Sequence, residues 1–229
     1  MRVLPDGGGA DEHRGAANLV RAIGEGGAKV EFVVGISTDK ACKPVNVMGM
    51  SKAIMERVLI EANMECPSTR FVCVRYGNVV ASRGSVVPLF LEQIARGGPV
   101  TITTAAMTRF FLTLDRAVDT VFAAMQHGNR GELFVPRVPA ALMTDVAAAL
   151  IDGRDVRVVV TGVRPGEKIH EIMVSEEEVN RTIERGGYYV ILPILPELRA
   201  AGGFTPALSG EYSSAEVTLD VPALRELLR

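Results

Sequence analysis

Residues 30–40 read Val-Glu-Phe-Val-Val-Gly-Ile-Ser-Thr-Asp-Lys, a short apolar run followed at once by polar side chains. Residues 30–36 are nearly continuous in apolar character and rich in β-branched side chains, which predicts a parallel strand buried on both faces. Asp39 and Lys40 follow the carboxyl end of that strand. Because ligands of open α/β sheets bind in the crevice beyond the strand ends, these two side chains are candidates for a functional site.

The segments around this strand alternate between helical and extended patterns. Apolar spacing predicts helices at about 15–25, 48–63, 86–97, 114–126, 142–152, 175–185 and 221–228. Strands are expected at 70–75 and near 100–103, 132–135, 157–161 and 188–192, with a loop at 76–79. This alternation indicates an α/β fold.

The composition of the chain excludes several classes of protein. The chain has 229 residues, of which 48% are apolar and 23% charged, as is usual for a soluble globular protein of one large domain, or one plus a small lobe. A net charge of -2 without a dense basic run argues against nucleic-acid binding. The three cysteines lack disulfide, zinc or C-x-x-C spacing, and no apolar run could span a membrane. We therefore expect a cytoplasmic protein with no bound metal and no membrane partner.

Further motifs occur in order along the chain. They are Ser-Thr-Asp-Lys at 37–40, Met-Gly-Met-Ser-Lys at 48–52, Arg-Tyr-Gly-Asn-Val at 75–79, Ser-Arg-Gly-Ser-Val at 82–86, Met-Thr-Arg-Phe at 107–110, Arg-Pro-Gly-Glu-Lys at 164–168 and Glu-Tyr-Ser-Ser at 211–214. Together they resemble the extended short-chain dehydrogenases, specifically the bacterial UDP-N-acetylglucosamine 4,6-dehydratases of polysaccharide biosynthesis. The resemblance covers about residue 14 to the end.

This resemblance implies a Rossmann-like parallel sheet, here only its second part, with a smaller C-terminal substrate-binding lobe. The domain would comprise residues 14–229, with substrate-binding elements at about 80–110 and 155–229. Residues 1–13 are expected to form a disordered Gly-rich tail.

The resemblance also implies a reaction. Hydride leaves C4 of the sugar for NADP, a base removes the C5 proton, water leaves from C6, and the hydride returns to C6. Asp39 would be the acid that assists departure of the 6-hydroxyl, Lys40 the base at C5, and Thr38 a hydrogen-bond partner near the 4-hydroxyl. Since neighbouring residues of a strand point to opposite faces, Asp39 and Lys40 can act together only if the strand has ended or bulged there. The alternative for this pair is a solvated ion pair in a loop.

Met48 and Lys52 are four residues apart and would share one helix face. Most short-chain dehydrogenases have at the first position a tyrosine that takes the hydroxyl proton, whereas a thioether cannot carry a proton. A subgroup of the dehydratases resembles this chain in having methionine there. Lys52, Thr38 or bound water remain as groups that could deprotonate the C4 hydroxyl. On helical spacing alone Met48 would be a core residue, and only its register with Lys52 favours a functional role.

Substrate contacts are also implied by the resemblance. Arg83, Arg109 and Arg164 lie in motifs that bind the nucleotide diphosphate, and a guanidinium fork suits phosphate oxygens. For each arginine the alternative is a solvated surface charge. Asn78 would contact the diphosphate or sugar, and Glu167 the uridine ribose.

The cofactor half of such a fold needs a strand, a glycine-rich turn and a helix that faces the pyrophosphate. Three glycines at 7–9 lack a long preceding strand and the required spacing, so a tail is the better interpretation. We expect a truncated chain in which Lys52 and Tyr76 would contact NADP, and whether this chain alone catalyses a reaction stays open. An exposed strand edge at 30–36 would favour a homo-oligomer or pairing with a separate N-terminal half.

Three functions remain open. The leading hypothesis is a UDP-N-acetylglucosamine 4,6-dehydratase-like protein. A UDP-sugar 4-epimerase shares its fold and cofactor but has no need for an elimination pair such as Asp39 and Lys40, so analysis of the product at C6 would separate the two. A non-catalytic UDP-sugar-binding protein would bind UDP without retaining NADP.

Overall fold

The computed structural model describes residues 12–26, 29–80, 85–199 and 202–228. The chain divides into two compact units. Unit 1 comprises Met1–Tyr76, Val118–Arg137 and Ile172–Tyr212, and unit 2 comprises Gly77–Ala117, Val138–Glu171 and Ser213–Arg229. Arg83 and most of the expected N-terminal tail lie outside the described residues.

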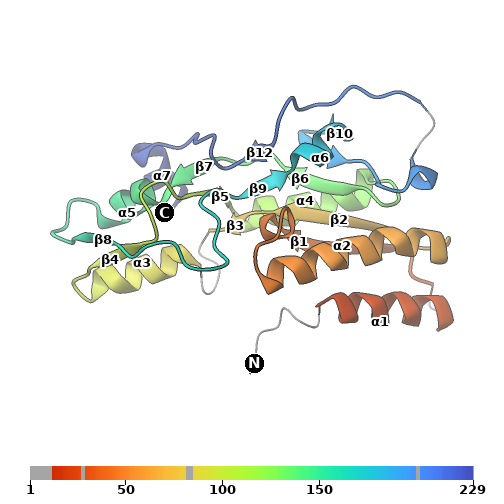
Figure 1. Cartoon of the computed structure of the whole chain (residues 1–229), viewed down its shortest axis with the longest axis horizontal. Coiled ribbons are helices and arrows are strands. Elements are labelled where there is room, and N and C mark those ends of the chain that lie inside the picture. The colour runs from red at the N-terminus through yellow and green to blue at the C-terminus, as the bar shows by residue number, and fades with distance from the viewer. Residues whose placement is uncertain (1–11, 27–28, 81–84, 200–201, 229) are drawn as a thin grey trace. The chain divides into compact units, whose positions relative to one another are not determined.

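Unit 1 is built on a five-stranded sheet (Figure 1). Its strands in spatial order are β1 (Phe32–Thr38), β2 (Arg70–Tyr76), β6 (Leu133–Pro136), β11 (Tyr188–Ile191) and β10 (Thr182–Arg185). The first three are parallel, and β11 runs antiparallel to both of its neighbours. The β1 and β2 register pairs Thr38 with Tyr76, so both residues stand at the carboxyl edge of the sheet.

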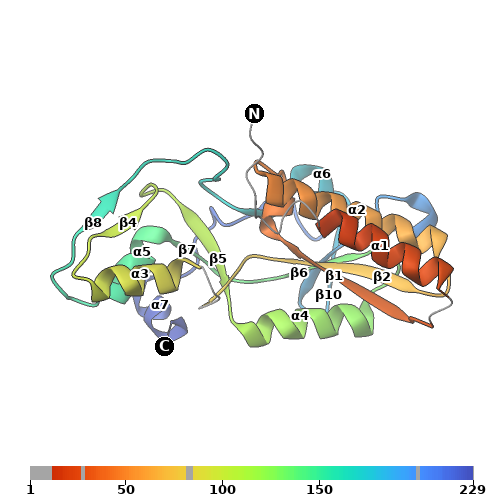
Figure 2. The same ribbon diagram turned by 90° about the horizontal axis from the view of Figure 1, so that it is seen from below.

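Helices cover both faces of this sheet. Figure 2 shows α1 (Glu12–Glu25) and α2 (Val47–Glu65) on one side and α4 (Leu114–His127) on the other. Val121 and Ala124 of α4 pack with Val72, Val74 and Phe134 of the sheet, which closes the core on that face. The remaining elements of this part are the short η1 (Asp39–Ala41), β9 (Ile172–Val174), α6 (Glu176–Val179) and η2 (Pro196–Leu198), with β12 (Tyr212–Ser213) at the unit boundary.

Unit 2 combines two small sheets with three helices. One sheet joins β3 (Asn78–Val79), β5 (Thr108–Leu112) and β7 (Ala140–Leu142), and the other pairs β4 (Val100–Ile102) in parallel with β8 (Val158–Val160). The helices are α3 (Val86–Ala95), α5 (Met143–Ile151) and α7 (Val221–Leu227). Phe90, Phe111, Val146 and Leu224 are fully buried where these elements meet.

The α/β class is confirmed, with three corrections. Residues 175–185 are not one helix, because α6 ends at Val179 and residues 182–185 form strand β10. Residues 76–79 are not a loop, since they end β2 and form β3. Strand β1 is not buried on both faces: Ile36 is 41% exposed, and among the described residues β1 is an edge strand. No helix in the described part of the chain is long and apolar enough to cross a membrane.

Candidate functional site

The carboxyl end of β1 brings the predicted acid and base together. The strand ends at Thr38 and η1 begins at Asp39, so the two side chains are not forced to opposite faces. Thr38 Oγ1 and Lys40 Nζ both donate to Asp39 Oδ1, at 2.8 and 2.9 Å. Asp39 is fully buried, so the alternative of a solvated ion pair does not hold for this carboxylate. Among the described residues its Oδ2 has no hydrogen-bond partner, which leaves one carboxylate oxygen to receive another donor.

A close approach between α2 and η1 fixes this strand end. Asn46 caps α2 by accepting a hydrogen bond from Gly49 N at 2.8 Å. A Cβ at Gly49 would lie 2.3 Å from the carbonyl oxygen of Lys40, a separation that no real Cβ tolerates. Only glycine therefore allows the first turn of α2 to pack against η1. The sequence analysis missed this role, although a glycine inside a helical motif was its signal.

Lys52 and Tyr76 stand at the same edge of the sheet. Lys52 Nζ donates to the carbonyl oxygen of Ile36 at 2.8 Å, which places its ammonium group against β1. Tyr76 lies opposite Thr38, and partial burial raises the pKa of its phenol. Met48 is 36% exposed, so the interpretation of this residue as core is wrong.

A buried ion network lies under this strand end. Arg75 donates to Glu56 through Nε and Nη2, at 3.0 and 2.7 Å, and through Nη1 to Glu178 at 2.8 Å. Ser37, next to Thr38, donates to Glu56 at 2.5 Å. The network therefore ties β1 to α2, β2 and α6.

The charges of this network shift two pKa values. Burial alone would lower the pKa of Arg75, but the charges of Glu56 and Glu178 outweigh it and the pKa is raised. Burial would raise the pKa of Glu178, but the charge and hydrogen bonds of Arg75 lower it. Both partners are therefore held in their charged forms. The roles of Ser37, Glu56 and Glu178 could not be predicted, since no short motif joins these three residues.

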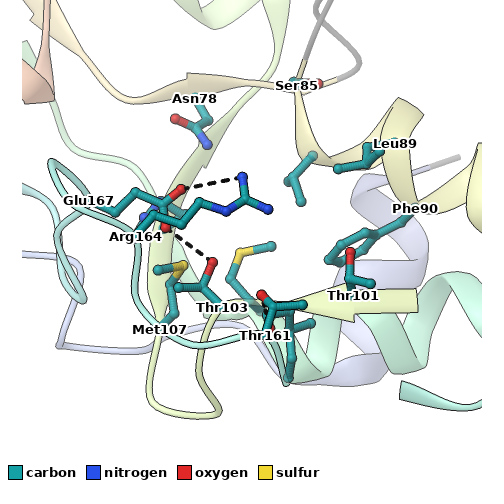
Figure 3. A pocket seen from close by; sticks show the side chains of 14 residues that line it. Asn78, Ser85, Leu89, Phe90, Thr101, Thr103, Met107, Thr161, Arg164 and Glu167 are labelled. Carbon is teal, nitrogen blue, oxygen red and sulfur yellow. Dashed lines mark hydrogen bonds and ion pairs between the residues drawn. The ribbon is translucent and has the colours of Figure 1, made fainter. Parts of the chain in front are cut away.

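Unit 2 holds a separate pocket of about 230 Å³ (Figure 3). Asn78, Arg109, Arg164 and Glu167 all line it, so the structure brings together the predicted substrate contacts that it describes. Arg164 Nη1 lies 3.9 Å from Glu167 Oε1, and Thr103 donates to Glu167 Oε2 at 3.3 Å. Lining residues that the sequence analysis missed include Phe90, Thr101, Thr103, Met107 and Thr161.

Arg109 and Arg164 differ in their surroundings. The Arg164 side chain is 69% exposed, whereas that of Arg109 is 11% exposed. Arg109 donates to the carbonyl oxygens of Thr108, Lys168 and Ile169, at 2.6, 3.0 and 3.1 Å. It therefore holds the loop that carries Arg164 against β5, and it is not a solvated surface charge.

Ser214 of the C-terminal Glu-Tyr-Ser-Ser motif bonds to Thr108, which stands between two residues that line the pocket. Ser214 Oγ lies 2.7 Å from Thr108 Oγ1 and accepts a hydrogen bond from Glu171 N at 2.9 Å. Thr108 Oγ1 also lies 2.8 Å from His170 Nδ1. These bonds join β5 to the end of the loop, which gives a structural role to a motif whose purpose the sequence did not reveal.

Solved structures confirm the fold. Pen from Bacillus thuringiensis is 30% identical, with a TM-score of 0.84, over 95% of this chain and 67% of Pen. The dTDP-glucose 4,6-dehydratase DesIV from Streptomyces venezuelae, solved with NAD and TYD, has a TM-score of 0.60 at 20% identity, over 69% of this chain and 55% of DesIV. WbmG from Bordetella bronchiseptica, solved with NAD and UDP, has a TM-score of 0.54 at 18% identity, over 72% of this chain and 60% of WbmG.

Curated proteins are also similar to this chain in sequence. A protein of Rickettsia prowazekii named UDP-glucose 4-epimerase is 42% identical over 93% of this chain, and one of Rickettsia typhi with the same name is equally similar. The chain spans 65% of the length of each. These names match the alternative enzyme of the sequence analysis better than its leading hypothesis. The family described as polysaccharide biosynthesis protein matches residues 12–193, and the chain belongs to this family.

Proposed function

We propose that this chain carries the C4 chemistry and the nucleotide pocket of a UDP-sugar 4-epimerase in polysaccharide biosynthesis. The observation that carries the proposal is the 42% identity, over 93% of the chain, with relatives named UDP-glucose 4-epimerase. An epimerase oxidises C4 of the sugar and then returns the hydride to the opposite face. The reaction needs a group that takes the C4 hydroxyl proton and a site that holds UDP.

The strand end of unit 1 offers groups for the first requirement. Thr38 offers a hydroxyl, Asp39 a buried carboxylate and Lys52 an ammonium, all at the carboxyl edge of the sheet. With the tyrosine position occupied by Met48, proton removal from the C4 hydroxyl falls to Lys52, Thr38 or water. The ammonium group of Lys52, held against the carbonyl oxygen of Ile36, would favour the oxyanion that forms at C4.

NAD or NADP would supply the hydride acceptor, as its presence in solved structures of the same fold suggests. Lys52 and Tyr76 suit the nicotinamide-ribose end of such a cofactor, because both present polar groups at one edge. Within the described ranges, the chain shows no glycine-rich turn between a strand and a helix that would hold the pyrophosphate.

The pocket of unit 2 suits the second requirement. Arg164 offers an exposed guanidinium fork for the diphosphate, Asn78 an amide, and Glu167 a carboxylate for ribose hydroxyls. Its volume of about 230 Å³ suits part of a nucleotide sugar, such as the base or the diphosphate. The fold neighbour WbmG holds UDP, which supports the same ligand class.

A 4,6-dehydratase is the second candidate, and one observation favours it. Asp39 and Lys40 lie 2.9 Å apart where the strand ends, which places side by side a carboxyl group and an amino group for acid-assisted loss of the 6-hydroxyl and removal of the C5 proton. An epimerase does not need this pair. Both enzymes share C4 oxidation, so they differ only in the steps after the 4-keto sugar has formed.

Product analysis separates the candidates. The purified chain is incubated with UDP-glucose or UDP-N-acetylglucosamine and with NAD or NADP, and the sugar nucleotide is examined by mass spectrometry and NMR. An isomer of unchanged mass with an inverted C4 supports the epimerase, and loss of one water with a 4-keto group supports the dehydratase. UDP binding without either product would point to the non-catalytic UDP-sugar-binding protein.

A further inference from the structure

A second cavity lies in unit 1, beside the segment that joins η1 to α2. Its volume is about 520 Å³, within the usual range of about 300–1,000 Å³ for small-molecule sites. Basic residues outnumber acidic ones in its lining. The basic residues are Lys43, Arg57, Arg75, Arg181 and Arg199, and the acidic ones are Glu56, Glu177 and Glu178.

Two of these cations have no neutralising partner among the described residues. Arg75, by contrast, is neutralised by Glu56 and Glu178. Arg199 donates only to the carbonyl oxygens of Pro193 and Ile194, which carry no net charge. In the part of the chain that the structure describes, Arg57 makes no hydrogen bond or ion pair.

The charge of Arg181 is only partly neutralised. Its Nη1 donates to the carbonyl oxygen of Leu192, and its Nη2 lies 3.6 Å from Glu178 Oε1. Burial lowers the pKa of Arg181, and the charges of Arg57, Arg75 and Arg199 lower it further, although Glu178 opposes them. Positive charge is therefore concentrated in this cavity beyond what its own carboxylates neutralise.

We propose that this cavity binds a small molecule through a phosphate or diphosphate group, held by Arg57, Arg181 and Arg199. Guanidinium forks match phosphate oxygens in pairs, and a multiply charged anion would relieve the repulsion among them. The site is separate from the nucleotide pocket, because every lining residue belongs to unit 1.

The cavity is connected to the candidate catalytic strand end. Glu178 contacts both Arg181 and Arg75, Arg75 contacts Glu56, and Glu56 accepts a hydrogen bond from Ser37 beside Thr38. An anion on Arg181 competes with Glu178 for that guanidinium and so acts on the same network. The ligand is therefore placed to regulate the strand end as well as to bind.

Isothermal titration calorimetry with inorganic pyrophosphate tests the proposal on the whole chain. Arg57→Gln and Arg199→Gln alter exposed side chains, so both variants are expected to fold. Each is expected to weaken pyrophosphate binding by about tenfold or more, the loss of a charge-assisted contact. Arg137→Gln is the matched control, an exposed arginine of unit 1 that does not line the cavity, and it should bind as the wild type does.

A second variant separates this site from the proposed UDP pocket. Arg164→Gln should leave unchanged the pyrophosphate binding that Arg57→Gln and Arg199→Gln weaken, because Arg164 does not line this cavity. Absence of pyrophosphate binding, or unchanged affinity in both Arg57→Gln and Arg199→Gln, would overturn the proposal. So would binding that is lost in Arg164→Gln alone, which would assign the anion to the nucleotide pocket.

Discussion

The strand end of unit 1 and the pocket of unit 2 differ in how firmly their charged groups are held. At the strand end, Asp39 is fully buried, and Arg75, Glu56 and Glu178 form a buried network directly beneath it. In the pocket, Arg164 is mostly exposed and its ion pair with Glu167 is long, at 3.9 Å. Under the proposed function, chemistry would fall to groups that the fold fixes, and recognition to groups that can adjust to a ligand. The two regions should respond differently to substitution, pH and ligand.

The sharpest contrast is expected from Arg75→Met. Removing this guanidinium leaves buried Glu56 without an ion-pair partner and Glu178 with only the more distant Arg181, which costs about 3–5 kcal/mol of unfolding free energy. Urea unfolding measures the loss. Arg137→Met removes an exposed ion pair and should cost about 0–1 kcal/mol. Equal effects of the two variants would show that the buried network does not stabilise the strand end.

Gly49→Ala tests the close approach between α2 and η1. The new Cβ would meet the carbonyl oxygen of Lys40 at 2.3 Å, and we expect a loss of about 1–3 kcal/mol together with most of the activity. The matched control is Gly15→Ala, a helical glycine of α1 with no described atom near its Cβ position. Helix propensity should make that variant more stable by about 0.5–1 kcal/mol. Gly49→Ala that is as stable and active as the wild type would contradict the assigned contact.

Protonation of Glu178 at low pH should lower the unfolding free energy of the chain. Although burial would raise its pKa, Arg75 lowers it below the ordinary value of 4.5, so the folded chain binds this proton more weakly than the unfolded chain does. The stabilisation is complete above about 4.5 and is lost as the pH falls through the folded-state pKa. Urea unfolding at several pH values below about 6 should show a steeper decline for the wild type than for Glu178→Gln. Equal declines of the unfolding free energy in the wild type and in Glu178→Gln would show that Glu178 does not cause the acid sensitivity.

The smallest effect on stability is expected in the pocket. Arg164→Gln changes an exposed side chain and should alter the unfolding free energy by no more than about 0.5 kcal/mol. UDP affinity should nevertheless fall by about tenfold, because a charge-assisted contact to the diphosphate is lost. Titration calorimetry with UDP measures it, and Arg96→Gln, another exposed arginine of the same unit, is the control. An unchanged UDP affinity would exclude Arg164 from the diphosphate site.

Local patterns predicted much of the fold and the order of its motifs. Apolar spacing located α2 and α4 closely, and β-branched runs located β1 and β2, because both signals are contained in neighbouring residues. The local pattern predicts a helix where β10 forms, because residues 182–185 follow a true helical turn without a strong breaker.

Contacts between residues far apart in the chain could not be predicted from the sequence. Arg75 and Glu178 are 103 residues apart, and nothing in either local sequence indicates that they meet. The role of Ser214 likewise depends on Thr108, 106 residues earlier in the chain. Spacing can identify which residues carry chemistry, but the supporting contacts depend on how distant strands pair.

The most direct test of the division between chemistry and recognition compares Asp39→Asn with Glu167→Gln by titration calorimetry with UDP. Asp39→Asn should bind UDP as the wild type does, because Asp39 belongs to the strand end and not to the pocket. Glu167→Gln should bind UDP more weakly, because its carboxylate lines the pocket. Lost affinity in Asp39→Asn with unchanged affinity in Glu167→Gln would contradict the assignment of the two regions.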